Sequence, residues 1–106
     1  MMLRQMQYDE SNHIWNGQLH GELDAVQAPK LLEAMDGYLK EHSGDVVFDC
    51  TQLVFVDSMG LGALVKLRKA VEAAGGSIKM KNMKQRIYKL FVITGLEDSF
   101  GIEVAQ

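Results

Sequence analysis

The strongest constraint on the fold is a strand-then-helix pattern in the middle of the 106-residue chain. The segment 45–50 (DVVFDC) holds three consecutive apolar residues, which is typical of a strand buried on both faces of a central, partly parallel sheet. From Met59 to Ala74 the small and apolar residues recur with the period of a helix, and Gly75-Gly76 follows as a stop signal. We therefore expect a buried strand followed by a helix that packs on the sheet.

The segments on either side extend this pattern to an α/β fold. Ranges 3–8 and 13–19 predict a hairpin around four turn-forming residues, and a helix is expected to begin close to Gln27, because Pro29 is tolerated only in a first turn. A strand at 77–82, a short helix with the apolar stripe Ile87, Leu90 and Phe91 that stops at Gly95, and a last strand at 100–104 complete the order. This order predicts an N-terminal β-hairpin and a sheet with helices packed on one side.

The length and composition indicate a single domain over residues 1–106. Hydrophobic residues make up 47% and charged residues 24%, which is ordinary for a globular protein, and the net charge of -3 gives no overall attraction to nucleic acid. The charges are uneven, however. Eight basic residues and one acid between Lys66 and Lys89 give that stretch +7, and the other 3 basic and 13 acidic residues give -10. The basic stretch is either a solvated face or a surface for phosphates or an acidic partner.

Several site classes find no support in the sequence. The single Cys50 ends an apolar run, as an inert buried thiol does, and His13, His20 and His42 are scattered without metal-ligand spacing. We expect no cofactor. No apolar stretch is long enough to span a bilayer or to form a signal peptide, so a cytoplasmic protein without membrane insertion is expected.

The pair Asp57-Ser58, at the junction of strand and helix, is the candidate site. Gly60-x-Gly62 lacks the third glycine of a dinucleotide-binding turn, and a nucleophile elbow would need glycine at position 56. Ser58 is then either a helix cap or a hydroxyl that another protein modifies, at a helix N-terminus that would stabilise a phosphate.

The helical wheel of 59–74 divides its apolar residues between two faces. We expect Gly60, Ala63, Leu64, Leu67, Ala70, Val71 and Ala74 on the core face. Leu61 and Val65 fall beside Arg68 and Glu72, away from that face, and we expect them to be partly exposed in a docking surface next to Ser58.

These residues also carry a family resemblance. The stretch DSMGLGALVKLRKAVEAAGGSIKM, with GELD at 21–24 and the later KLFVITGLEDSF, resembles the STAS domain family, in particular the bacterial anti-sigma factor antagonists. The resemblance implies a mixed, mostly parallel sheet with helices mainly on one side. It also implies a non-enzymatic phosphoprotein that regulates transcription by partner switching. The implied partners are a serine kinase of the histidine-kinase-like ATPase class, which is also the anti-sigma factor, and a PP2C-type phosphatase.

The resemblance assigns roles to individual residues. Ser58 is the implied phosphate acceptor, and the implied partner-binding residues are Asp24, Asp57, Met59, Gly60, Leu61, Gly62 and Val65. Met59 stands where the family commonly has a second serine or a threonine. The alternative is a STAS subunit of a membrane-associated complex, such as a lipid transporter, in which Ser58 is never modified.

Overall fold

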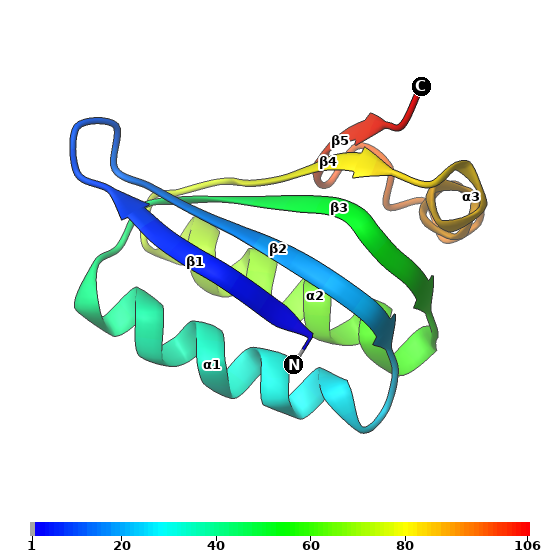
Figure 1. The fold of residues 1–106 in the computed structure, drawn as a ribbon, viewed down its shortest axis with the longest axis horizontal. Coiled ribbons are helices and arrows are strands. Elements are labelled where there is room, and N and C mark those ends of the chain that lie inside the picture. Colours follow the sequence, from blue (N-terminus) through cyan, green and yellow to red (C-terminus); the bar gives the residue numbers. More distant parts are fainter. Residues whose placement is uncertain (1) are drawn as a thin grey trace.

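A mixed sheet forms the framework of the protein in the computed structural model, which describes residues 2–106. Within this range five strands lie in the order β1-β2-β3-β4-β5 (Figure 1). The strands are β1 (Leu3–Asp9), β2 (Ile14–Leu23), β3 (Asp45–Val56), β4 (Ile78–Met83) and β5 (Gly101–Val104). β1 pairs antiparallel with β2, and the other neighbours are parallel. The predicted hairpin and mostly parallel sheet are confirmed.

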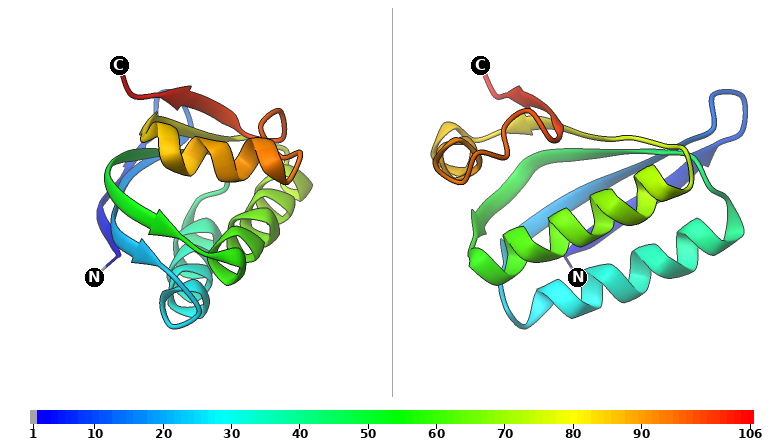
Figure 2. Two further views of the ribbon diagram at one scale, coloured as in Figure 1. Left: turned by 90° about the vertical axis from the view of Figure 1, so that its right-hand side faces the viewer. Right: turned by 180° about the vertical axis from the view of Figure 1, so that it is seen from behind.

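Three helices connect the strands in the described range. They are α1 (Gln27–Glu41), α2 (Ser58–Ala73) and α3 (Gln85–Ile93). α1 and α2 run side by side across one face of the sheet, and α3 lies beside the bent end of β3 and the end of β4 (Figures 1 and 2). The prediction of helices mainly on one side is confirmed.

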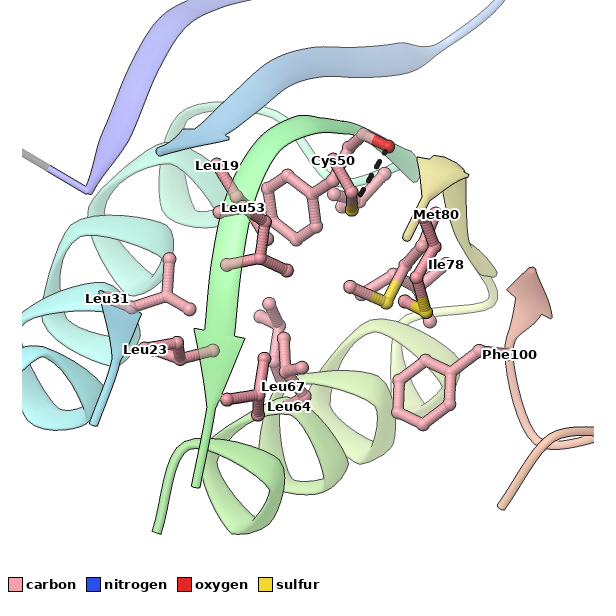
Figure 3. Close-up of a cluster of buried hydrophobic side chains, with 14 of the residues drawn as sticks. Leu19, Leu23, Leu31, Cys50, Leu53, Leu64, Leu67, Ile78, Met80 and Phe100 are labelled. Carbon is pink, nitrogen blue, oxygen red and sulfur yellow. Dashed lines mark hydrogen bonds between the residues drawn. The ribbon is translucent and has the colours of Figure 1, made fainter. Parts of the chain in front are cut away.

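The core lies between the sheet and these helices (Figure 3). In β3 the side chains of Val46, Phe48 and Cys50 are buried, whereas Val47 and Asp49 between them are only half-buried. The strand is central and parallel, as predicted, but the expectation that it is buried on both faces is wrong. The opposite face of the sheet carries no helix in the described residues, so buried and half-buried side chains alternate along this part of β3.

Short polar and glycine signals set the ends of the helices. The carboxylate of Asp24 accepts hydrogen bonds from the amides of Val26 and Gln27, so α1 begins at Gln27 and Pro29 lies in its first turn, as predicted. α2 ends in a Schellman motif, in which the amide of Gly76 donates to the carbonyl of Val71 over 3.0 Å and Gly75 has a φ of +88°.

The buried face of α2 differs in part from the helical wheel. Ala63, Leu64, Leu67 and Val71 are buried, as predicted. Leu61 is only 6% exposed, so the expectation that it lies on the surface is wrong. The expected burial of two alanines, at 70 and 74, is also wrong. α2 contacts the sheet and also α1 beside it, and a helix with two neighbouring elements buries a wider arc than one stripe predicts.

Candidate docking and modification site around Ser58

Ser58 is the first residue of α2, and Asp57, not Ser58, caps this helix. The Asp57 carboxylate accepts a hydrogen bond from the Gly60 amide over 2.8 Å, and the backbone of Asp57 is extended. Of the two alternatives for Ser58, the helix cap is therefore ruled out. The Ser58 residue is exposed, and no group in residues 2–106 hydrogen-bonds to its hydroxyl. The hydroxyl is thus accessible to an external reagent.

The electrostatics at this position are mixed. Ser58 and Met59 occupy the first turn of a 16-residue helix, where free amides and the helix dipole stabilise an added anion. The adjoining Asp57 carboxylate opposes it. A phosphate on Ser58 would bring about 1.5 to 2 further negative charges to this end of the helix. The site can hold a phosphate, and such a group would change its charge strongly.

Gly60 brings the start of α2 against the end of β2. A Cβ atom at Gly60 would lie 2.2 Å from the Leu23 carbonyl oxygen, so the close approach requires glycine. The amide of Asp57 donates to that same carbonyl over 3.1 Å. Gly62 has a different situation, because it is exposed and a Cβ atom there would meet nothing within 4 Å. Close packing therefore requires glycine at position 60 and does not require it at position 62.

This close approach places the turn before α1 next to the start of α2. Asp24 is half-buried, and its carboxylate holds the turn that leads into α1 by accepting from the amides of Val26 and Gln27, so it serves the fold directly. Two large apolar side chains at this end are open to solvent, since Val26 is 62% and Met59 60% exposed. We call Asp24, Val26, Asp57, Ser58 and Met59 the Ser58 surface.

The sequence-predicted residues divide accordingly. Val65 is half-buried and packs against the core cluster, so it is partly exposed, as expected. Leu61 and Gly60 are buried and do not contribute side-chain surface. Sequence reasoning missed Val26. The sequence feature that could have revealed it is an apolar residue in the polar turn before α1, where no helix face requires an apolar side chain.

Other chemistry has little support in the described part of the chain. His13 and His42 both contact Tyr8, by a hydrogen bond of 3.1 Å and by ring stacking at 4.1 Å. Within residues 2–106, no three His, Cys, Asp or Glu side chains are grouped as metal ligands would be. In the same range, each helix is too short or too polar to cross a membrane.

Comparison with known proteins places this geometry in a family. The model of the STAS domain matches residues 5–105. The anti-sigma-B factor antagonist of Bacillus subtilis (strain 168) is 39% identical over 82 residues, which cover 77% of this chain and 74% of that protein.

Solved structures share the fold at lower identity. The anti-sigma factor antagonist SpoIIAA in its unphosphorylated form aligns with a TM-score of 0.70 at 18% identity, covering 96% of this chain and 88% of that one. SpoIIAA in its phosphorylated form gives 0.69 at 20% identity, covering 96% and 90%. A sulfate transporter family protein from Wolinella succinogenes gives 0.75 at 14% identity, covering 93% and 81%. The family model spans nearly the whole chain, and the chain therefore belongs to the STAS domain family.

Proposed function

We propose that this protein is an anti-sigma factor antagonist that acts as a phosphorylation-controlled binding module. Its unmodified form binds a serine kinase of the histidine-kinase-like ATPase class that is also an anti-sigma factor, and phosphorylation of Ser58 releases that kinase. A PP2C-type phosphatase restores the binding form. The observation that carries the proposal is the Ser58 hydroxyl, exposed and without a hydrogen-bond partner in the described residues, at the start of α2.

The surroundings of the hydroxyl support a role in docking. Exposed Val26 and Met59 offer apolar contact area beside Ser58, and apolar surface at the centre of an interface contributes much of its binding energy. A phosphate beside Asp57 would place about 1.5 to 2 extra negative charges in this area, and desolvating them on docking would be costly. Binding then weakens without any change of fold.

The names of similar proteins also support the proposed function. The proteins that match at 32–39% identity are named anti-sigma-B factor antagonists, and SpoIIAA has been solved with and without phosphate. By this likeness the protein is a substrate and a switch rather than an enzyme, it needs no cofactor, and it acts in the cytoplasm on transcription.

The test is phosphorylation by the serine kinase encoded nearest to this gene. Purified protein and its Ser58→Ala variant are incubated with the kinase and ATP, and the phosphate is mapped by mass spectrometry. We expect one phosphate on Ser58 in the parent and none in the variant. A Ser58→Ala protein that is modified as fully as the parent would refute Ser58 as the acceptor.

A second function is favoured by one specific observation. The fold aligns as well with a sulfate transporter family protein as with SpoIIAA. In this alternative the protein is a constitutive subunit of a membrane-associated transport complex, and its Ser58 surface docks a transporter component without being modified. Genes for a transporter, in place of a serine kinase, next to this gene would favour it.

A further inference from the structure

An apolar groove lies between the second half of β3 and α3. Its walls include Val54, Phe55, Arg86, Lys89 and Ile93, and its volume is about 310 Å³. The groove exists because β4 pairs only with the first half of β3, in the register 46–49 with 78–81, while β2 continues beside β3 to Val56. Beyond the end of its pairing with β4, β3 faces α3 in place of a strand.

Large apolar side chains are exposed along this groove. The register between β2 and β3 shifts at Val54, since Gly21 pairs with Leu53 and Glu22 with Phe55. Such a bulge breaks the alternation of side chains. Val54 and Phe55 therefore both face solvent, and Phe55 is 48% exposed. On α3, Ile93 is 81% exposed. Core packing does not account for these side chains.

The rim of the groove is basic. The Arg86 guanidinium donates to the Val54 carbonyl over 3.0 Å, so this side chain is held against β3. Lys89 lines the groove as well. No Asp or Glu occurs in residues 73–96. The basic charge of this rim is thus not neutralised by acids of its own segment.

Size and charge together define the occupant. The volume is at the lower end of the ~300–1,000 Å³ typical of small-molecule sites, and the groove is open, so it suits a few apolar anchor side chains better than a whole ligand. The basic rim selects an acidic neighbour for those anchors. An amphipathic segment of a protein, with apolar residues on one face and Asp or Glu beside them, meets both requirements.

We propose that the groove is a second docking site for the kinase, and that an acidic amphipathic segment of the kinase occupies it. This inference rests on the proposed function and deepens it. Phe55 precedes Ser58 by three residues, and α3 and the start of α2 lie at the same end of the molecule (Figures 1 and 2). One partner can therefore contact the groove and the Ser58 surface together. The groove then contributes affinity and partner specificity, which the Ser58 hydroxyl alone does not provide.

The test compares neighbouring exposed residues on the same helix. Ile93→Asp places a charge in the groove, whereas Val92→Asp changes an exposed side chain that does not line it. Lys89→Glu reverses a rim charge, and Lys66→Glu reverses an exposed charge on α2 as its control. For each variant we measure the melting temperature, the dissociation constant by calorimetry, and the kcat and KM of Ser58 phosphorylation by the kinase.

We expect Ile93→Asp and Lys89→Glu each to raise the dissociation constant and KM about tenfold, the size of a strong interface contact, with kcat unchanged because Ser58 is untouched. The two controls should stay within about twofold of the parent. All four melting temperatures should match the parent, since the altered side chains are exposed.

Three results would overturn the inference while leaving the proposed function intact. They are groove variants that bind and are phosphorylated like the parent, a dimer by analytical ultracentrifugation that only Ile93→Asp dissociates, and binding to phosphatidylglycerol vesicles that only the groove variants lose. A parent protein that the kinase neither binds nor phosphorylates would instead refute the proposed function, and the groove inference with it.

Discussion

Gly60 and Gly62 lie two residues apart on α2 but meet opposite surroundings. A Cβ atom at position 60 would lie 2.2 Å from a backbone carbonyl of Leu23, whereas position 62 has open space. We expect Gly60→Ala to destabilise the fold by about 1–3 kcal/mol through overpacking. Gly62→Ala should stabilise it by about 0.5–1 kcal/mol, since alanine favours the helix. Urea unfolding measures both, and equal effects would contradict the close approach of α2 to β2.

Asp57 combines two roles, as a helix cap and as a charge beside Ser58. Its carboxylate accepts a hydrogen bond from the Gly60 amide. Asp57→Ala should therefore cost about 0.5–2 kcal/mol of stability, while Asp57→Asn keeps an oxygen acceptor and should cost little. Thermal unfolding tests this pair of variants. An Asn variant as unstable as the Ala variant would mean that the charge, not the cap, stabilises α2.

Asp49 on the open face of the sheet links stability to pH. The hydroxyl of Thr51, which donates to its carboxylate over 2.6 Å, is the main cause that lowers the pKa of Asp49 below its ordinary value of 3.8, with further help from the Thr51 amide and Asn82. A lowered folded-state pKa stabilises the fold above pH 3.8, and this contribution is lost as the pH falls below that value. Asp49→Asn should be less stable than the parent at pH 7, and the difference should shrink toward pH 3 in urea unfolding. A constant difference would contradict this linkage.

At the scale of the elements, α2 shows where a one-dimensional pattern is sufficient and where it is not. The helical period predicted the burial of Leu64, Leu67 and Val71, because these residues face the sheet layer that any amphipathic helix must cover. It misplaced Leu61, because contact with α1 is a tertiary feature that the period of one helix does not contain. A helical wheel indicates one apolar stripe, whereas a helix that packs against two neighbouring elements buries a wider face.

This correction carries a prediction about Leu61. Its side chain is part of the core, so Leu61→Ala should cost about 2–5 kcal/mol of stability, as other buried leucines do. Val65 is half-buried, so Val65→Ala should lower the stability less than Leu61→Ala does. Calorimetric unfolding of the two variants measures the difference. At a temperature where it is folded, the Leu61→Ala protein should still bind the kinase with parental affinity. A loss of affinity without a loss of stability would restore the docking role first expected of Leu61.

β3 gives the complementary lesson. Its place in the centre of the sheet and its parallel neighbours followed from the apolar run of DVVFDC. The bulge at Val54 did not, since a bulge depends on pairing with β2 and has no local sequence signal in VFV. For this reason the position of Ser58 could be predicted from the chain alone, while the exposed Phe55 and the groove beside it appeared only in three dimensions.

At the scale of the whole molecule, the proposed switch is a local change of charge on a constant fold. The chain aligns with unphosphorylated SpoIIAA at a TM-score of 0.70 and with phosphorylated SpoIIAA at 0.69, so the fold described here is common to both forms of that protein. In this chain Ser58 is exposed and lies outside the core cluster, so the proposed phosphate would displace no core side chain. The free-energy difference between the two states therefore belongs to the complex, not to folding.

The corresponding prediction separates binding from stability. Ser58→Ala should bind the kinase like the unmodified parent, because the hydroxyl makes no hydrogen bond within residues 2–106. Ser58→Glu should weaken binding in part, because it carries one negative charge where a phosphate carries about 1.5 to 2. Phosphorylated parent should bind weakest, and all forms should keep their circular dichroism spectra and nearly equal melting temperatures. Calorimetric titration gives the order of affinities. If phosphorylated protein bound as tightly as the Ser58→Ala variant, the Ser58 surface would dock its partner regardless of charge, as the transporter-subunit alternative requires.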